Sequence, residues 1–172
     1  MKNKIIVLLI SIFSAISPTF GNVYDYPNDL SGIIKQLPKI DSIKCKFRQE
    51  KHLQNISKPL ISSGNFEFKI NKGVYFHTLQ PVESTTNYTN KTYKQINDII
   101  NAISTKKYSK IEKEFNFFYE GDIKKWALGM KPKKQSNAYD YISTITVEGT
   151  DYINRISIQQ TNGNRTVLWF IK

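Results

Sequence analysis

The stretch Trp126-Ala-Leu-Gly-Met-Lys-Pro-Lys133 decides the fold more clearly than any other part of this chain. Large apolar residues stand at every second position, Trp126, Leu128 and Met130, and small or polar residues stand between them. Successive side chains of a strand point to opposite faces, so this period of two predicts a strand with one buried face. The stretch carries no catalytic motif. It therefore indicates a sheet that buries apolar surface.

The same period recurs along most of the chain. Ile43, Cys45 and Phe47 alternate with charged residues, and Gly64 leads into Phe66 and Phe68, again with polar residues between them. Asn- and Gly-rich segments at 71–73, 121–122, 149–151 and 162–164 are typical of hairpin turns. We expect strands near 43–48, 64–70, 74–81, 84–89, 115–119, 123–130, 142–147, 152–158 and 166–171.

Two segments have the period of a helix instead. Residues 30–37 carry an apolar face behind an Asn or Asp cap and end at Pro38. The second segment runs from Tyr93 to about Ser104, and the Lys106-Lys107 pair suits its C-terminal dipole. The element order is helix, four strands, helix and about five strands, which predicts one α+β domain with antiparallel strands.

The first residues predict export. Lys2 and Lys4 precede an apolar run from Ile5 to Ile16, and small residues at Thr19 and Gly21 suit cleavage after Gly21. We therefore expect a signal peptide at 1–21 and a single domain at 22–172, in the periplasm. The alternative, an uncleaved anchor helix, is disfavoured because a spanning helix needs roughly 18–20 apolar residues. The apolar run is not followed by a lipid-acceptor cysteine.

The chain is strongly basic, with 25 Lys and Arg against 14 Asp and Glu and a net charge of +11. The basic residues are scattered in small clusters, and an exported chain rarely meets nucleic acid, so we expect no nucleic-acid partner. Attraction to anionic membrane surfaces or to an acidic partner fits the compartment better. A Lys- and Asn-rich genome would explain the excess equally well. Cys45 is the single cysteine of the sequence, so it forms no intrachain disulfide. We interpret it as a small apolar core residue.

Motifs that would carry catalysis are missing from the sequence. His52 and His77 stand in unrelated contexts, and no metal-binding or nucleophile motif surrounds either one. Acidic residues are sparse, and spacing singles out no pair for glycoside hydrolysis. We expect no enzyme activity, no metal and no cofactor.

The chain is instead rich in large apolar side chains at strand spacing. In most proteins such a stripe is only the core of a sheet, but two helices cover a wide sheet poorly, which predicts a cleft for hydrophobic cargo. The expected cargo-binding residues are Phe47, Phe66, Phe68, Phe76, Phe117, Trp126, Leu128, Met130 and Trp169. The expected lid residues, on the second helix, are Tyr93, Ile96, Ile99, Ile100 and Ile103.

Several motifs, in this order, resemble the periplasmic lipoprotein carrier family (LolA-like) across residues 30–170. They are Phe47-Arg-Gln49, Gly64-Asn-Phe-Glu-Phe68, Gly73-Val-Tyr-Phe76 with Leu79-Gln-Pro81, the middle helix, and residues 126–133. The resemblance implies an unclosed antiparallel β-barrel whose concave face is covered by helices. It also implies a monomeric carrier of a Gram-negative cell that shelters the acyl chains of lipoproteins, or of a related lipid. Its partners would be an inner-membrane transporter and an outer-membrane receptor.

Two features depart from the family pattern. The family's Arg-Pro before the third strand is replaced by Phe68-Lys-Ile-Asn-Lys-Gly73, and the sequence ends at Lys172 without a C-terminal extension. Both favour a divergent branch that serves a glycolipid or acyl-product export system. The alternative to a carrier is an interaction module of such a system, with a cleft filled by its own side chains and a basic face that docks a partner.

Overall fold

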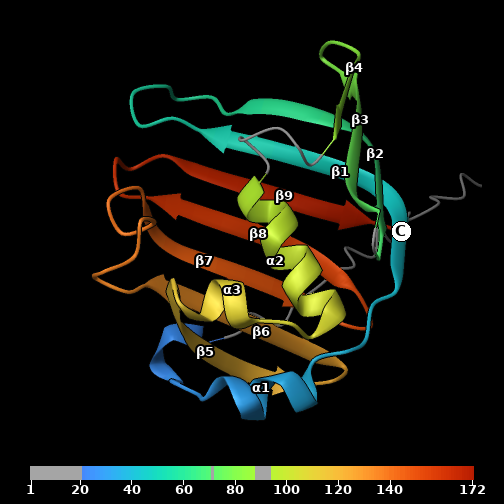
Figure 1. Cartoon of the computed structure of the whole chain (residues 1–172). Helices are drawn as coiled ribbons and strands as arrows, with labels where there is room; N and C mark the ends of the chain where they lie inside the picture. The colour runs from blue at the N-terminus through green and yellow to red at the C-terminus, as the bar shows by residue number, and fades with distance from the viewer. Residues whose placement is uncertain (1–20, 71, 88–93) are drawn as a thin grey trace, which may run out of the picture.

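The described residues, 21–70, 72–87 and 94–172 of a computed structural model, form one antiparallel sheet of nine strands (Figure 1). The order across the sheet is β4-β3-β2-β1-β9-β8-β7-β6-β5. β4 and β5 are the two edges and do not pair with each other, so the sheet is not closed into a barrel. The strands are β1 (Ser42–His52), β2 (Leu60–Lys69), β3 (Gly73–Gln80), β4 (Ser84–Asn87), β5 (Phe115–Asp122), β6 (Lys125–Pro132), β7 (Ile142–Gly149), β8 (Ile153–Gln160) and β9 (Arg165–Ile171).

Alternating side chains explain why these segments form strands. In β2 the buried Phe66 and Phe68 alternate with the exposed Asn65, Glu67 and Lys69. A strand with one apolar and one polar row is stable in an antiparallel sheet that has one wet face. The nine strands and their antiparallel order confirm the expected α+β class with an unclosed, curved sheet.

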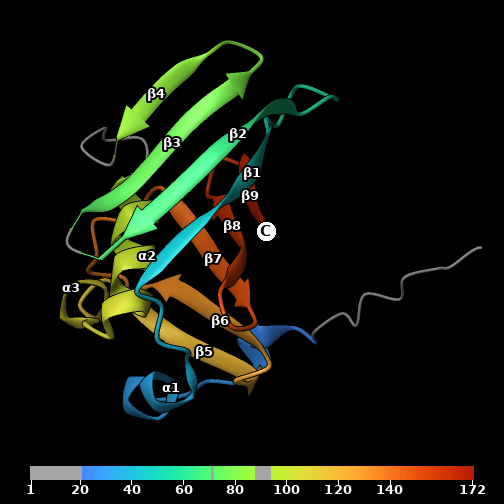
Figure 2. The same cartoon turned by 90° about the vertical axis from the view of Figure 1, so that its right-hand side faces the viewer.

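Glycines lie at tight turns and at an irregularity in the pairing of β2 and β3. Gly73 and Gly163 adopt φ values of 85° and 83°, which other residues rarely adopt. Gly73 begins β3 directly after the turn from β2, and Gly163 lies in the turn between β8 and β9. The register of β2 and β3 shifts between Ser63 and Gly64, where a Cβ on Gly64 would lie only 2.0 Å from the carbonyl oxygen of His77. Bulges of this kind bend a strand. The sheet curves around α2 (Figure 2).

The helices are η1 (Val23–Asp25), α1 (Leu30–Gln36), α2 (Lys94–Thr105) and α3 (Ser109–Glu112). Asp29 caps α1, because its carboxylate accepts a hydrogen bond from the backbone N–H of Gly32 at 2.7 Å. α2 ends where expected, followed by Lys106 at φ 56°. The short α3 and η1 were not expected from the sequence.

α2 lies across the concave side of the sheet, which we call the inner face (Figures 1 and 2). α1 lies at the β5 edge and contributes Ile33 and Leu37 to the same core. The 3-10 helix η1 contacts β5 and β6. Its Tyr24 ring packs against Phe118, which alternates with core residues of β5 and therefore lies on the opposite, outer face. The inner face is thus the place where sheet and helices bury their apolar surface together.

Candidate functional site

Aromatic side chains of β1, β2, β3 and β9 form one half of the inner face. The ring centroids of Phe47 and Phe76 are 5.1 Å apart in an edge-to-face contact, and those of Phe66 and Phe76 are 5.0 Å apart. Phe66 also packs against Phe170 of β9 at 4.5 Å. These separations are in the favourable range for aromatic pairs. Phe68, further along β2, belongs to the same buried cluster.

The other half of the inner face comes from β5 and β6. Trp126, Leu128 and Met130 are fully buried, and Phe117 faces them from β5. The indole Nε1 of Trp126 donates a hydrogen bond to the carbonyl oxygen of Thr150 at 2.7 Å, so burial leaves its polar atom satisfied. All eight of the expected cargo-face residues named so far lie in one hydrophobic cluster.

Trp169 is the exception among the expected cargo-face residues. It lies outside the buried cluster, whereas its neighbours Leu168 and Phe170 are inside it. It pairs with Arg48 of β1 and Arg155 of β8, which both point to the outer face. The assignment of Trp169 to the cargo face was wrong because residues 167–171 are all apolar, so alternation could not tell the two faces of β9 apart.

The expected lid lies on the inner face. Ile96, Ile99, Ile100 and Ile103 of α2 are between 0 and 4 % exposed and belong to the same cluster as the aromatic residues. Asn101, on the other side of α2, is exposed. Lys110 of α3 forms an ion pair with Asp98 of α2 at 2.8 Å. The fifth expected lid residue, Tyr93, lies outside the described residues.

The inner face is filled rather than open. The expected cleft residues on it are at most 7 % exposed, because the isoleucines of α2 occupy the space between the two halves of the sheet. Smaller openings flank α2. One of about 270 Å³ is lined by Ile99, Ile111 and Phe115, and one of about 210 Å³ is lined by Ile96, Gln49 and Ile158. The described residues therefore show α2 packed on the inner face, with two openings beside it.

Three buried hydroxyl groups have no hydrogen-bond partner among the described residues: those of Ser104, Tyr108 and Tyr119. Burial raises the pKa of Tyr119 to about 12, and it also raises the pKa of Tyr108. Both phenols therefore stay neutral at ordinary pH. These hydroxyls introduce polar atoms into a mostly apolar interior.

Each of the two histidines lies beside a glutamate. His52 lies 3.1 Å from Glu50, and His77 lies 3.0 Å from Glu83, in each case between imidazole Nε2 and a carboxylate oxygen. Within the described ranges no three His, Cys, Asp or Glu side chains are grouped so that they could hold a metal ion. Cys45 is half-buried against the core, and burial raises the pKa of its thiol. A thiol of raised pKa is a weak nucleophile at neutral pH.

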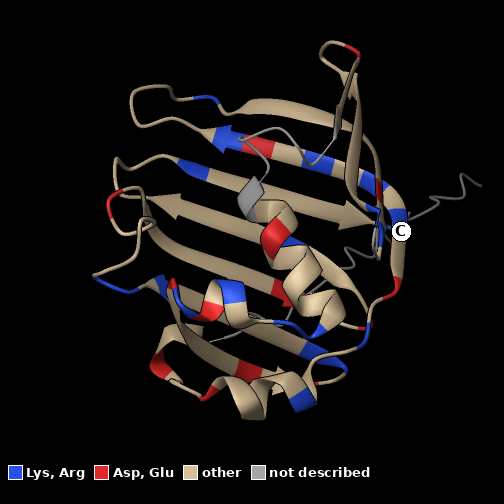
Figure 3. Cartoon of the chain, in the orientation of Figure 1, with Lys and Arg blue, Asp and Glu red and all other residues tan. Residues whose placement is uncertain are grey.

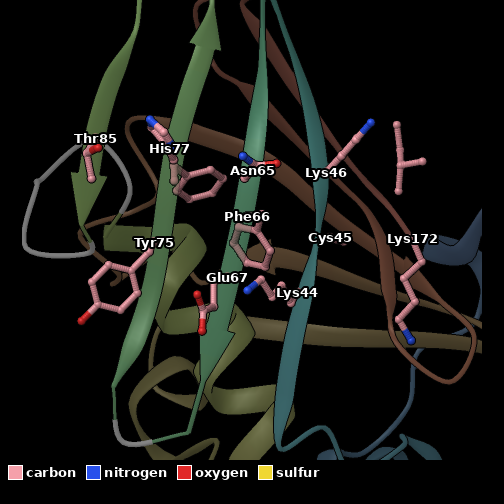
Figure 4. A pocket seen from close by; sticks show the side chains of 12 residues that line it. Lys44, Cys45, Lys46, Asn65, Phe66, Glu67, Tyr75, His77, Thr85 and Lys172 are labelled. Carbon is pink, nitrogen blue, oxygen red and sulfur yellow. The ribbon is translucent and has the colours of Figure 1, made fainter.

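A hollow of about 710 Å³ lies on the outer face of β1, β2 and β3 (Figure 4). Lys44, Lys46 and Lys172 line it together with Glu67 and Tyr75. Figure 4 shows these side chains on the side of the strands turned away from α2. Sequence reasoning missed this hollow, although Lys44 and Lys46 occupy the polar positions of the same period of two that predicted the inner face.

Basic residues are spread over the chain rather than gathered on one element (Figure 3). β1 carries four of them, and three of these, Lys44, Lys46 and Arg48, stand at alternate positions. The described helices include none that is long and apolar enough to cross a bilayer.

Fold and site together define a class: an unclosed antiparallel sheet whose apolar inner face is covered by one amphipathic helix. No family model matches the sequence, and no curated protein matches it. Among solved structures, the chain is similar to a DUF1329 family protein from Desulfovibrio piger, with 11 % identity and a TM-score of 0.34. That similarity covers 86 % of this chain and 89 % of the other, and at this TM-score it carries no functional inference.

Proposed function

We propose that the protein is a periplasmic carrier that shelters the acyl chains of lipoproteins, or of a related lipid, beneath α2. It would take this cargo from an inner-membrane transporter and deliver it to an outer-membrane receptor, without catalysing a reaction. The expected signal peptide supports the compartment. The LolA-like order of motifs from Phe47-Arg-Gln49 to residues 126–133 supports the family.

The observation that carries this proposal is the contact between α2 and the aromatic inner face. Four isoleucines of α2 cover Phe66, Phe76, Trp126 and their neighbours in one continuous apolar cluster. A core of this kind usually packs between elements that cannot separate. Here the covering element is a single helix of 12 residues, with openings on two sides.

The magnitudes permit exchange between the helix and an acyl chain. Burial of four isoleucine side chains contributes on the order of 6–12 kcal/mol. A fatty acyl chain with about 14 methylenes, at about 0.8 kcal/mol each, contributes about 11 kcal/mol when buried. Because the two values are similar, cargo that displaces α2 replaces the apolar contacts it breaks. A carrier needs such a near balance in order to load and unload.

A fluorescent fatty acid tests the proposal. Titrated into the purified protein, it should bind with saturation, and an acylated peptide should displace it where the unacylated peptide does not. Binding that the unacylated peptide displaces equally well, or an absence of binding in the folded protein, would contradict the carrier.

A second candidate function is an interaction module of a glycolipid or acyl-product export system. It is favoured by the filled inner face and by the 710 Å³ outer hollow with Lys44, Lys46 and Lys172 on its wall. In this alternative α2 never leaves the sheet, and the lysines bind an acidic partner. The two candidates differ in one respect that is easy to measure, because only the carrier requires lipid on the inner face.

A further inference from the structure

The segment that follows the expected signal peptide is fastened to the outer face of β5 and β6. The hydroxyl of Tyr24 donates a hydrogen bond to the carbonyl oxygen of Ile145 at 2.9 Å, and its ring packs edge-to-face on Phe118 at 5.4 Å. Lys131 Nζ lies 4.8 Å from the centre of the Tyr24 ring. Gly129 provides the space, because a Cβ there would lie 2.9 Å from Tyr24 Cε1. We call residues 22–27 the N-terminal clasp.

The clasp continues as a short strand-like contact with β5. Tyr119 donates its backbone N–H to the carbonyl oxygen of Tyr26 at 3.1 Å, and Pro27 forms a bridge with Phe118. At the other end of the clasp, the side chain of Asn22 accepts a hydrogen bond from the backbone N–H of Tyr24 at 3.3 Å. Asn22 is therefore held in place by hydrogen bonds within the clasp.

An unpaired carboxylate lies next to this residue. Glu120 is two positions beyond Phe118 on the same face of β5, and its Oε2 is buried without a hydrogen-bond partner among the described residues. A Cβ placed on Gly21 would lie 3.7 Å from Glu120 Oε1 and 3.9 Å from Oε2. A buried carboxylate oxygen without a donor is costly, which calls for a cation or a donor at this point.

We propose that cleavage between Gly21 and Asn22 supplies the missing cation. Hydrolysis of this peptide bond consumes one water, leaves a carboxylate on Gly21 and leaves an α-ammonium group on Asn22. The nitrogen of Asn22 is three covalent bonds from the Cβ position that lies beside Glu120. The new ammonium group pairs with the Glu120 carboxylate and completes the clasp.

This pairing makes the fold sensitive to its own processing. Before cleavage the nitrogen of Asn22 is an uncharged amide, and the Glu120 carboxylate lacks its partner. After cleavage the first residue, the clasp and β5 are joined by an ion pair, two ring contacts and backbone hydrogen bonds. The inference depends on export and cleavage, and not on the binding of lipid.

Four forms of the processed protein test this pairing: the free amine and the enzymatically N-acetylated amine, each with Glu120 and with Glu120→Gln. Mass spectrometry of the exported protein should first show Asn22 as its first residue. Acetylation or Glu120→Gln alone should lower the thermal midpoint by roughly 2–4 °C. The two changes together should lower it no further than one alone, because each removes the same pair. Glu112→Gln, an exposed acid on α3, should leave the effect of acetylation unchanged.

The titration of the amine gives an independent readout. Pairing with a carboxylate should raise the pKa of the α-amino group above its ordinary range of about 7.7–8.0. The extra stability should then be complete below the ordinary pKa and be lost as the pH rises through the raised one. A first residue other than Asn22, additive effects of the two changes, or an amine that titrates in its ordinary range would each overturn the proposal. A failure to bind fatty acid would leave it standing and would count against the carrier alone.

Discussion

At the scale of single residues, the centre of the proposed lid is Ile100. Its side chain is fully buried in the cluster that contains Phe66 and Trp126. The resemblance to the LolA-like family implies an arginine that helps to hold the lid closed. The matching stretch here contains only Lys69 and Lys72. Both lysines are exposed. Lysine also lacks the planar guanidinium group through which arginine can donate several hydrogen bonds at once. Apolar packing is then the main force that holds α2 closed.

Replacement of Ile100 by asparagine should weaken binding of the fluorescent fatty acid at least about tenfold, because it places an amide in the apolar contact between α2 and the inner face of the sheet. Lys69→Ala and Lys72→Ala should change binding less than about twofold. Ile123→Asn, the same change at an isoleucine that is 60 % exposed, serves as the control. Circular dichroism should show that all four variants are folded. Loss of binding in either lysine variant, with Ile100→Asn unaffected, would refute this account of the lid.

The two tryptophans should behave differently. Trp126→Ala should lower the free energy of unfolding by about 3–5 kcal/mol, because it empties a fully buried site and removes the bond to Thr150. Trp169→Ala should change fatty acid binding little, since Trp169 lies on the outer face. Denaturant unfolding and fluorescence titration measure the two effects. If Trp169→Ala strongly weakened fatty acid binding without changing the stability, Trp169 would have to be part of the cargo site.

At the scale of elements, α2 differs from the strands beneath it. The central strands β7, β8 and β9 each pair on both sides, whereas α2 is joined to the sheet mainly through its isoleucines. Elements held by few polar contacts open locally at lower free energy than the strands of a core. The lid is therefore the element that we expect to move.

Native-state hydrogen exchange should show this difference. Amides within residues 97–103 of α2 should exchange faster than those of residues 145–147 and 156–158, which lie in paired strands. The expected ratio is at least about tenfold, and it should change when fatty acid is added. Equal exchange in α2 and in the central strands, with and without fatty acid, would mean that α2 opens only when the whole domain unfolds.

At the scale of the whole molecule, alternation in the sequence predicted the sheet well where polar neighbours marked the outer face. Phe66 and Trp126 are examples, since charged or small residues flank each of them. Alternation failed at residues 167–171, where an unbroken apolar run hid the outward position of Trp169. It also missed the N-terminal clasp, because the fit of Tyr24 over Gly129 joins residues more than 100 positions apart. Local patterns cannot encode such a contact.

The filled interior was also not predicted from the sequence. A sheet wider than its helices suggested an open cleft, but curvature reduces the inner area that α2 must cover. The bend at Gly64 and the coiling of the sheet bring the two aromatic halves close enough for one row of isoleucines to fill the space between them. The carrier and the interaction module both accommodate a filled core. They differ in whether lipid ever enters between α2 and the sheet.

The most direct measurement starts from protein that is purified from the periplasm without added detergent. The protein is extracted with organic solvent, and the extract is examined by mass spectrometry. The carrier account predicts an acylated molecule bound in a substantial fraction of the protein, depleted in Ile100→Asn and retained in Ile123→Asn. Extracts free of acylated molecules in the unaltered protein, or equal amounts in both variants, would contradict a cargo site beneath α2.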